Sequence, residues 1–176
     1  MSDHPHVEVF TDSTYSKKSG KGGYAAILKC GEHEKEVAGG FRLTAVGRMD
    51  LMAAIAGLQA LKKYCQVSVY SDSVYLVDSM VKRLPKTWRE NSWIRSNSHG
   101  KPGGGGQVKN GDLWERLLEL CEGHEVAFKW IQGHCGQNEN DRCDKLANQW
   151  AQQTILPNDE GYQREIGSLW LGTTDR

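Results

Sequence analysis

Four aspartates spread along the chain are the residues whose type and placement could do chemistry. They are Asp12, Asp50, Asp72 and Asp144. Carboxylate oxygens are hard ligands that suit Mg²⁺ or Mn²⁺. Two such ions about 4 Å apart favour in-line displacement at phosphorus, because one can activate a water while the other stabilises the leaving oxygen. If the aspartates converge, they predict metal-dependent phosphodiester hydrolysis.

Convergence depends on the strands that carry two of these residues. Residues 7–10 alternate apolar and polar before Thr11 and Asp12, and a short apolar run at 67–70 comes before Asp72. The carboxyl ends of neighbouring parallel strands share one edge of a sheet, so we expect Asp12 and Asp72 to lie close together. Like charges roughly 4 Å apart cost about 4 kcal/mol at an effective dielectric of about 20, and cations must offset that cost. For any single Asp beside a Ser, a role in a turn or a helix cap is the alternative.

The elements that position the aspartates follow from hydrophobic periodicity and turn residues. The predicted strands are 7–10, 24–30, 34–41, 67–70 and 125–131. The predicted helices are 49–64, 74–80 with Ser73 as its cap, a short one around Trp88, 113–121 and 140–153. The first three strands suit an antiparallel meander, and the strand, helix, strand, helix order that follows implies a parallel crossover.

Length and composition limit the class of protein. A chain of 176 residues is long enough for one core and short for two, so we expect a single domain. No apolar run approaches the roughly 20 residues that span a bilayer, and the N-terminus has no apolar signal core, which predicts a cytoplasmic protein without a membrane partner. The five cysteines are odd in number and lack CxxC spacing, so we expect reduced thiols.

Positive charge is concentrated in one segment, although the formal net charge is zero. Residues 82–109 hold a single acid, Glu90, and seven basic residues: Lys82, Arg83, Lys86, Arg89, Arg95, Lys101 and Lys109. Trp88 and Trp93 are interleaved with them. Cations here could neutralise phosphates and the indoles could pack on sugars. The alternative is a solvated helix with ordinary packed tryptophans.

Six separated segments match, in order, the signature segments of one family. They are FTDST, GRMDLMAAIAGLQAL, YSDSVYL, VKNGDLWERL, WIQGHCGQNENDRCDKLA and DEGYQ, and they span Val7 to Gln163. The chain therefore resembles bacterial type 1 ribonuclease H. The resemblance implies an α/β, ribonuclease H-like fold with a five-stranded mixed sheet, three antiparallel strands then two parallel, flanked by helices. It also implies endonucleolytic cleavage of RNA in RNA/DNA hybrids, with 5′-phosphate and 3′-hydroxyl ends.

The resemblance also assigns roles to individual residues. Asp12 would bridge two Mg²⁺ ions, for which Mn²⁺ could substitute. Asp50 and Asp72 would hold the ion near the leaving group, and Asp144 the ion near the attacking water. His134 matches the mobile histidine of the family, whose imidazole can shuttle protons near neutral pH and assist product release. On its own, His134 would be a solvated loop histidine.

The predicted domain limits combine the resemblance with Pro157, which marks the end of the last predicted helix. Residues 1–155 would form one catalytic domain, with a basic protrusion at about 82–109 that grips the DNA strand, and 156–176 would be a C-terminal tail. We expect a monomer whose partner is an RNA/DNA hybrid. The predicted substrate-binding residues are Lys82, Arg83, Lys86, Trp88, Arg89 and Trp93.

The chain departs from the family pattern close to the predicted site. The family usually has a glutamate where this chain has Asp50, whose side chain is shorter by one carbon–carbon bond, about 1.5 Å. That glutamate also touches the RNA 2′-hydroxyl beside the cleaved phosphate. The other departures are at Ser13, Lys18, Ala45, Val46, Gly47 and Val74. They leave the acids in place and alter the residues expected to contact the minor groove.

Three hypotheses for function follow. The leading one is a ribonuclease that acts on RNA/DNA hybrids. The second is a hybrid-binding protein whose hydrolysis is impaired by Asp50 and by the lost polar contacts. The third is a related nuclease with a different nucleic-acid substrate.

Overall fold

The computed structural model describes residues 4–97, 105–134, 136 and 138–171. Its strands are β1 (His6–Tyr15), β2 (Gly22–Cys30), β3 (His33–Phe41), β4 (Gln66–Ser71) and β5 (Glu125–Trp130). Its helices are α1 (Val46–Gln59), α2 (Val74–Val81), α3 (Leu84–Glu90), α4 (Gly111–Glu122), α5 (Asn138–Ala151) and α6 (Glu160–Leu171). Among these residues no helix is long and apolar enough to cross a membrane.

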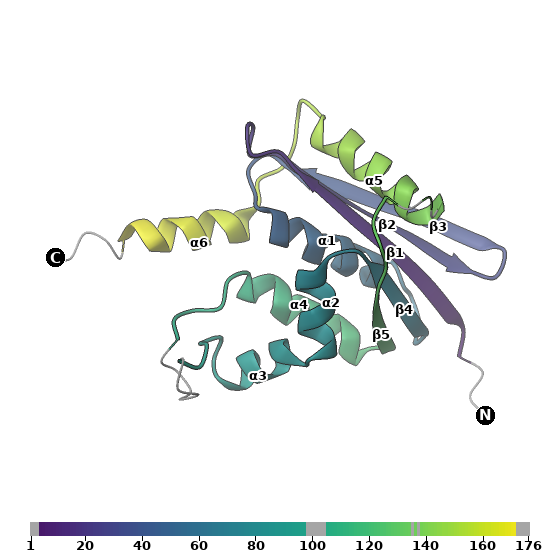
Figure 1. Cartoon of the computed structure of the whole chain (residues 1–176), viewed down its shortest axis with the longest axis horizontal. Coiled ribbons are helices and arrows are strands. Elements are labelled where there is room, and N and C mark those ends of the chain that lie inside the picture. Colours follow the sequence, from purple (N-terminus) through teal and green to yellow (C-terminus); the bar gives the residue numbers. More distant parts are fainter. Residues whose placement is uncertain (1–3, 98–104, 135, 137, 172–176) are drawn as a thin grey trace.

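The five strands form one mixed sheet in the order β3-β2-β1-β4-β5. β1 pairs antiparallel with β2, and β2 pairs antiparallel with β3. β4 lies parallel to β1 on its other side, and β5 lies parallel to β4. The predicted sheet of three antiparallel strands followed by two parallel strands is confirmed (Figure 1).

Helices cover both faces of the sheet (Figure 1). α5 packs on β1, β2 and β3 over a small apolar cluster that includes Ile27, Cys143 and Ala147. α1 packs on the opposite face against β1 and β2, and α4 packs on α1. The main core lies on this second face and includes Val9 and Trp114. β1 is therefore central to both layers.

Two glycines let these helices approach the sheet closely. A side chain at Gly57 of α1 would lie 2.6 Å from Val9 Cγ1, and one at Gly23 of β2 would collide with the backbone of Ala147 in α5. Real Cβ atoms do not approach neighbours this closely, so both contacts require glycine. The close packing fixes α1 and α5 relative to β1.

Two elements differ from their predicted bounds near the aspartates. β1 continues through the polar run to Tyr15, because β2 pairs with it as far as Tyr15 and Gly22. Asp12 therefore lies within a strand, and not after it as predicted. α1 begins at Val46, three residues earlier than predicted, and ends at Gln59, because the chain must turn before β4 begins at Gln66.

The segment after residue 156 also differs from the tail that the sequence suggested. Leu156 and Asp159 are buried, and α6 follows directly. The Arg42 N–H donates to the Pro157 carbonyl at 2.9 Å, which ties this segment to the end of β3. These anchors lie far away in the sequence, so local periodicity carried no sign of them.

Candidate active site

The ends of the parallel strands bring Asp12 and Asp72 together. The parallel ladder of β1 and β4 ends with the pair Thr11 and Ser71, so the two aspartates occupy the next positions on neighbouring strands. The charge of Asp72 raises the pKa of Asp12. The predicted proximity of the two carboxylates agrees with this register. The Trp130 Nε1–H donates to the backbone oxygen of Asp72 at 3.1 Å and fixes the start of the turn after β4.

Asp12 is a buried acid whose charge has few stabilising partners, and the residue is only 9% exposed. Burial raises its pKa from 3.8 to about 7, with Asp72 and Asp144 adding to the rise. The Ser13 N–H, which donates to Asp12 Oδ1 at 2.7 Å, and the charge of His134 act in the opposite direction. The protein thus destabilises the charged form of Asp12, and the two groups that lower its pKa do not outweigh burial and the neighbouring acids.

Asp50 lies at the first turns of α1 and is held by two hydroxyls. Ser13 Oγ donates to Oδ1 at 2.5 Å, and Ser73 Oγ donates to Oδ2 at 2.7 Å. Burial raises the pKa of Asp50, the two serines lower it, and Asp72 raises it again. Sequence reasoning missed both serine contacts, although Ser13 was noted as a departure from the family pattern.

Asp144 approaches β1 from α5. It is half-buried, and the Asn148 Nδ2–H donates to its Oδ1 at 2.8 Å. Because α5 packs on β1, the charge of Asp144 raises the pKa of Asp12. The fourth aspartate therefore reaches the same site from the opposite face of the sheet to α1.

His134 lies in the loop between β5 and α5, exposed and in the left-handed region with φ of 53°. Its charge is felt by Asp12, which places the imidazole on the side of the aspartates. Gly133 packs directly against Asp72, since a side chain at this position would collide with Asp72 Oδ2. The loop is thus fitted to the acidic site, although residues 135 and 137 lie outside the described part of the chain.

The aspartates meet in pairs rather than as a compact cage. Asp12 is coupled to Asp72 and Asp144, and Asp50 is coupled to Asp72. Within the described ranges, no three His, Cys, Asp or Glu side chains are close enough to hold a metal ion, and none of the four forms an ion pair with Lys or Arg. The donors are all carboxylate oxygens. They fit a hard divalent cation, whose charge would stabilise the carboxylate form of Asp12 that burial and the neighbouring acids disfavour.

The basic segment divides into residues with internal partners and residues without. Arg89 lies 2.8 Å from Glu115 and 2.7 Å from Glu122 of α4. The Trp88 ring packs edge-on against Trp114 at 5.7 Å between centroids, and Trp93 packs partly buried against the core. Three of the six predicted substrate-binding residues thus help to hold the segment on α4.

The remaining described cations of this segment face solvent. Lys82 pairs with Asp78 one helical turn away at 2.7 Å. Arg83 and Lys86 are exposed and form no ion pair with any residue that the structure describes. Lys101 lies outside the described residues. Arg83 and Lys86 are therefore available to an anionic ligand.

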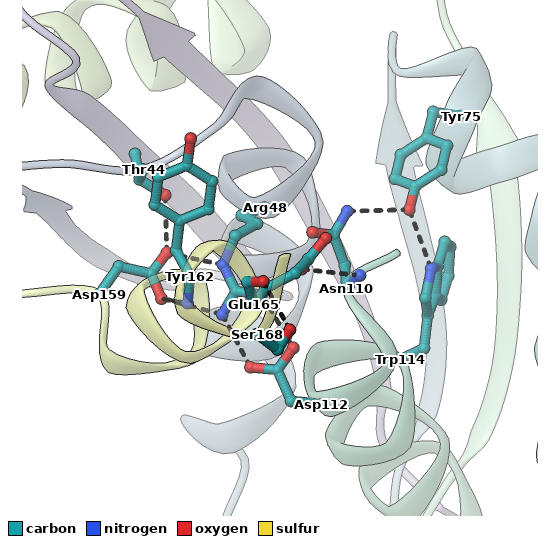
Figure 2. Close-up of polar contacts among 10 residues, drawn as sticks. All are labelled: Thr44, Arg48, Tyr75, Asn110, Asp112, Trp114, Asp159, Tyr162, Glu165 and Ser168. Carbon is teal, nitrogen blue, oxygen red and sulfur yellow. Dashed lines mark hydrogen bonds and ion pairs between the residues drawn. The ribbon is translucent and has the colours of Figure 1, made fainter. Parts of the chain in front are cut away.

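Sequence reasoning also missed a charged network beside the site. Arg48 is 1% exposed, and it donates to Asp159 at 2.7 and 2.9 Å and to Asp112 at 2.8 and 2.7 Å. Thr44 Oγ1 adds a bond of 2.6 Å to Asp159 (Figure 2). Burial lowers the pKa of Arg48, but the two carboxylates outweigh it and raise the pKa above its usual value. The network joins α1, α4 and the segment before α6.

A second polar contact fixes the start of α4. Tyr75 Oη of α2 accepts from Asn110 Nδ2 at 3.1 Å and from Trp114 Nε1 at 3.0 Å (Figure 2). Glu165 of α6 accepts from the Asn110 N–H at 3.3 Å. These bonds link the end of the basic segment to α2, beside Asp72, and to α6.

Comparison with known protein families supports the architecture and the class of enzyme. A family model described as RNase H matches residues 4–152. A protein named ribonuclease H from Rippkaea orientalis is 46% identical over 94% of this chain and 98% of its own length. Another from Syntrophus aciditrophicus is 46% identical over 89% of this chain and 86% of its own length.

Solved structures show the same fold at lower sequence identity. LC9-RNase H1, described as a type 1 RNase H with the type 2 active-site motif, has a TM-score of 0.71 at 24% identity, covering 92% of this chain and 81% of its own. A foamy viral protease-reverse transcriptase in complex with dsDNA has a TM-score of 0.63 at 17% identity, covering 85% and 96%. Ribonucleases H generally use divalent metal ions. On its sequence and its fold, the chain belongs to the ribonuclease H family, the nucleases that act on RNA/DNA hybrids.

Proposed function

We propose that the chain cleaves the RNA strand of RNA/DNA hybrids endonucleolytically, with two Mg²⁺ ions held by Asp12, Asp50, Asp72 and Asp144, and leaves 5′-phosphate and 3′-hydroxyl ends. The observation that carries the proposal is the buried Asp12 carboxylate, whose pKa is raised to about 7 and which has acids as neighbours without an ion-paired cation among the described residues. Raised carboxylate pKa values of this kind concentrate at functional sites.

The aspartates would divide the work between the two faces of the sheet. When bound, the ions activate the attacking water and stabilise the leaving oxygen. In addition to burial, the charges of both Asp72 and Asp144 raise the pKa of Asp12, so Asp12 is the residue whose carboxylate would be suited to hold both ions. Asp50 and Asp72 would serve the leaving-group side, and Asp144 on α5 would serve the water side. Mn²⁺ would substitute for Mg²⁺, because both take oxygen ligands.

His134 would move protons at the edge of the site. It is exposed, it lies on a short loop beside Asp72, and its charge reaches Asp12. An imidazole can accept and return a proton near neutral pH. We assign it to proton transfer around the attacking water and to product release.

Arg83 and Lys86 would bind the backbone of the DNA strand. Both are exposed cations without an ion pair among the described residues, so neutralising phosphates breaks no internal contact. We assign Trp88, Arg89 and Trp93 to holding this surface in place more than to contacting the substrate, because each packs against or pairs with another element of the fold. Lys82 is exposed and pairs with Asp78 on the surface of α2. The expected monomeric state and cytoplasmic location stay predictions.

The test is cleavage of a hybrid whose RNA strand is labelled, with Mg²⁺, followed by mass spectrometry of the product ends. We expect 5′-phosphate and 3′-hydroxyl RNA fragments, no cleavage of duplex RNA or duplex DNA, and no cleavage by Asp12→Asn. Circular dichroism confirms that each sample is folded. Failure of the folded wild-type protein to cleave any hybrid contradicts the proposal, and equal cleavage of duplex DNA favours a different nuclease.

One observation favours a second function, hybrid binding with impaired hydrolysis. Asp50 stands where the family usually has the longer glutamate, and both of its carboxylate oxygens already accept hydrogen bonds from the hydroxyls of Ser13 and Ser73. On this hypothesis the protein binds the hybrid with little turnover, and Asp50→Glu raises the turnover rate. A rate for Asp50→Glu at or below that of the wild type removes the second function.

A further inference from the structure

The carboxylate of Asp50 is enclosed by hydroxyls from two other elements. Ser13 of β1 donates to Oδ1 at 2.5 Å, and Ser73, the N-cap of α2, donates to Oδ2 at 2.7 Å. Ser73 Oγ also accepts from the Leu76 N–H at 3.2 Å, so part of its role is to begin α2. The Ser13 hydroxyl has Asp50 as its hydrogen-bond partner and no capping role.

Ser13 also connects the two faces of the sheet. Along β1, Val7 and Val9 face the main core under α1, whereas Phe10 packs with the cluster under α5. Side chains alternate along a strand, so Ser13 faces α1 with Asp50, and Asp12 faces α5 with Asp144. The Ser13 backbone N–H donates to Asp12 Oδ1 at 2.7 Å while its hydroxyl donates to Asp50. One residue thereby holds two of the acids in a fixed relation.

The length of Asp50 gives this contact its importance. An aspartate reaches about 1.5 Å less far from α1 than a glutamate would, because it lacks one carbon–carbon bond. A carboxylate oxygen has two acceptor positions, so a hydroxyl bond to each oxygen leaves one position on each for a cation. Short bonds from a hydroxyl to a carboxylate are charge-assisted and restrict how the carboxylate can rotate.

We propose that Ser13 is a positioning residue that holds the Asp50 carboxylate in the orientation required to ligate a divalent cation, so that Ser13 and Asp50 work as a matched pair. The inference rests on the proposed function, because it assumes that Asp50 ligates an ion. A serine hydroxyl at position 13 compensates for the shorter acid by fixing it from β1. A longer acid at position 50 would reach past this hydroxyl and lose the benefit of it.

A double-mutant cycle tests the pairing with Ser13→Ala, Asp50→Glu and the double variant. Isothermal titration with Mg²⁺ gives the dissociation constant of each folded protein, and steady-state kinetics on a labelled hybrid separate kcat from KM. We expect Ser13→Ala to weaken Mg²⁺ binding by about tenfold and to lower kcat by a similar factor with little change in KM. In the Asp50→Glu background the same substitution should change either value by less than about twofold.

Two further variants separate positioning from stability. Ser13→Thr keeps the hydroxyl and should keep Mg²⁺ affinity within about threefold of the wild type. Ser68→Ala removes a buried hydroxyl of β4 that contacts His6 at 3.1 Å, away from the aspartates, and should leave affinity and kcat unchanged. If Ser13→Ala lowers stability, Ser68→Ala shows how much of that decrease the loss of any buried hydroxyl causes. A decrease in stability alone does not change the Mg²⁺ dissociation constant of a protein that is still folded, so a change in that constant reports on positioning.

The outcomes distinguish the two proposals. Equal effects of Ser13→Ala in the Asp50 and the Asp50→Glu backgrounds overturn the pairing, as does unchanged Mg²⁺ affinity in Ser13→Ala. Either outcome leaves the proposed function standing, provided that the wild-type protein binds Mg²⁺ and cleaves the hybrid. A wild-type protein that neither binds Mg²⁺ nor cleaves hybrid overturns both.

Discussion

Helix α1 carries two charged residues only two positions apart whose surroundings differ. Arg48 is fully buried, and the carboxylates of Asp112 and Asp159 compensate its charge. Asp50 accepts hydrogen bonds from neutral hydroxyls, and burial and then the charge of Asp72 raise its pKa. The buried Asp12 has Asp72 and Asp144 as acidic neighbours. Burying a charge is costly unless a partner is supplied. The Arg48 network supplies its partners from within the chain, whereas no Lys or Arg among the described residues pairs with the aspartates, and under the proposed function a divalent cation would take that place.

The difference separates a region whose buried charges are paired within the chain from a region whose acids lack a Lys or Arg partner among the described residues. In the Arg48 network every charge contributes to joining α1, α4 and the segment before α6 (Figure 2). In the aspartate site, burial and then the repulsion from Asp72 and Asp144 raise the pKa of Asp12 to about 7. Substitutions in the two regions should therefore change stability in opposite directions.

The largest effect is expected from breaking the Arg48 network. Arg48→Met leaves Asp159, which is 4% exposed, as a buried carboxylate without its guanidinium. Loss of one partner of a buried ion pair typically costs about 3–5 kcal/mol, and we expect a decrease of that size in the free energy of unfolding in urea. Arg142→Met is the matched control, because Arg142 pairs with Glu34 and Glu36 at the surface and should cost about 0–1 kcal/mol. Equal losses in the two variants would refute the distinction.

The second effect concerns the pH dependence of stability without metal. The pKa of Asp12 in the folded protein is about 7, above its ordinary value of 3.8, so folding strengthens proton binding. The resulting stabilisation is fully present below about pH 4 and is lost as the pH rises through about 7, with a total of up to about 4 kcal/mol. Thermal unfolding in a chelator across this range should show the decline, and millimolar Mg²⁺ should reverse it near neutral pH.

Asp12→Asn should remove both effects of the unpaired Asp12 charge, the loss of stability with rising pH and the stabilisation by Mg²⁺. The metal-free variant should unfold at a higher temperature than the wild type at pH 8, should vary less with pH, and should respond less to Mg²⁺. Asp78→Asn is the control, because Asp78 is exposed and pairs with Lys82 on the surface of α2. A full Mg²⁺ response in Asp12→Asn would place the ion elsewhere.

The smallest effect extends the comparison to the basic segment, where Arg89 has partners and Arg83 has none among the described residues. Arg83→Ala, measured in the Asp12→Asn background by fluorescence anisotropy with a labelled hybrid, should weaken binding a few-fold. It should also reduce the slope of log affinity against log salt by about one. Arg89→Ala should leave the slope unchanged, because its charge is already neutralised by Glu115 and Glu122. Identical slope changes would show that internal ion pairs do not decide which cations meet the substrate.

The sequence predicted the succession of strands and main helices along the chain because these depend on local patterns. Alternation in β1 and β4, helical spacing in α1 and α5, and turn residues between strands are all readable within about ten residues. The proximity of Asp12 and Asp72 was also predictable, since the carboxyl ends of adjacent parallel strands share an edge. The end of β1 was not, because pairing with β2 extends that strand through residues that would otherwise form a turn.

By itself, the sequence determined which residue types were available: four aspartates on the right elements, a glycine-flanked histidine and a basic segment. The tertiary structure alone decided which charges are compensated. The bond from Ser13 to Asp50 spans 37 residues and that from Arg48 to Asp159 spans 111, and neither leaves a local pattern. Whether a buried charge has a partner depends on how distant segments pack. For that reason the same helix carries one residue whose charge is paired with carboxylates and, two positions later, one whose partners are neutral hydroxyls.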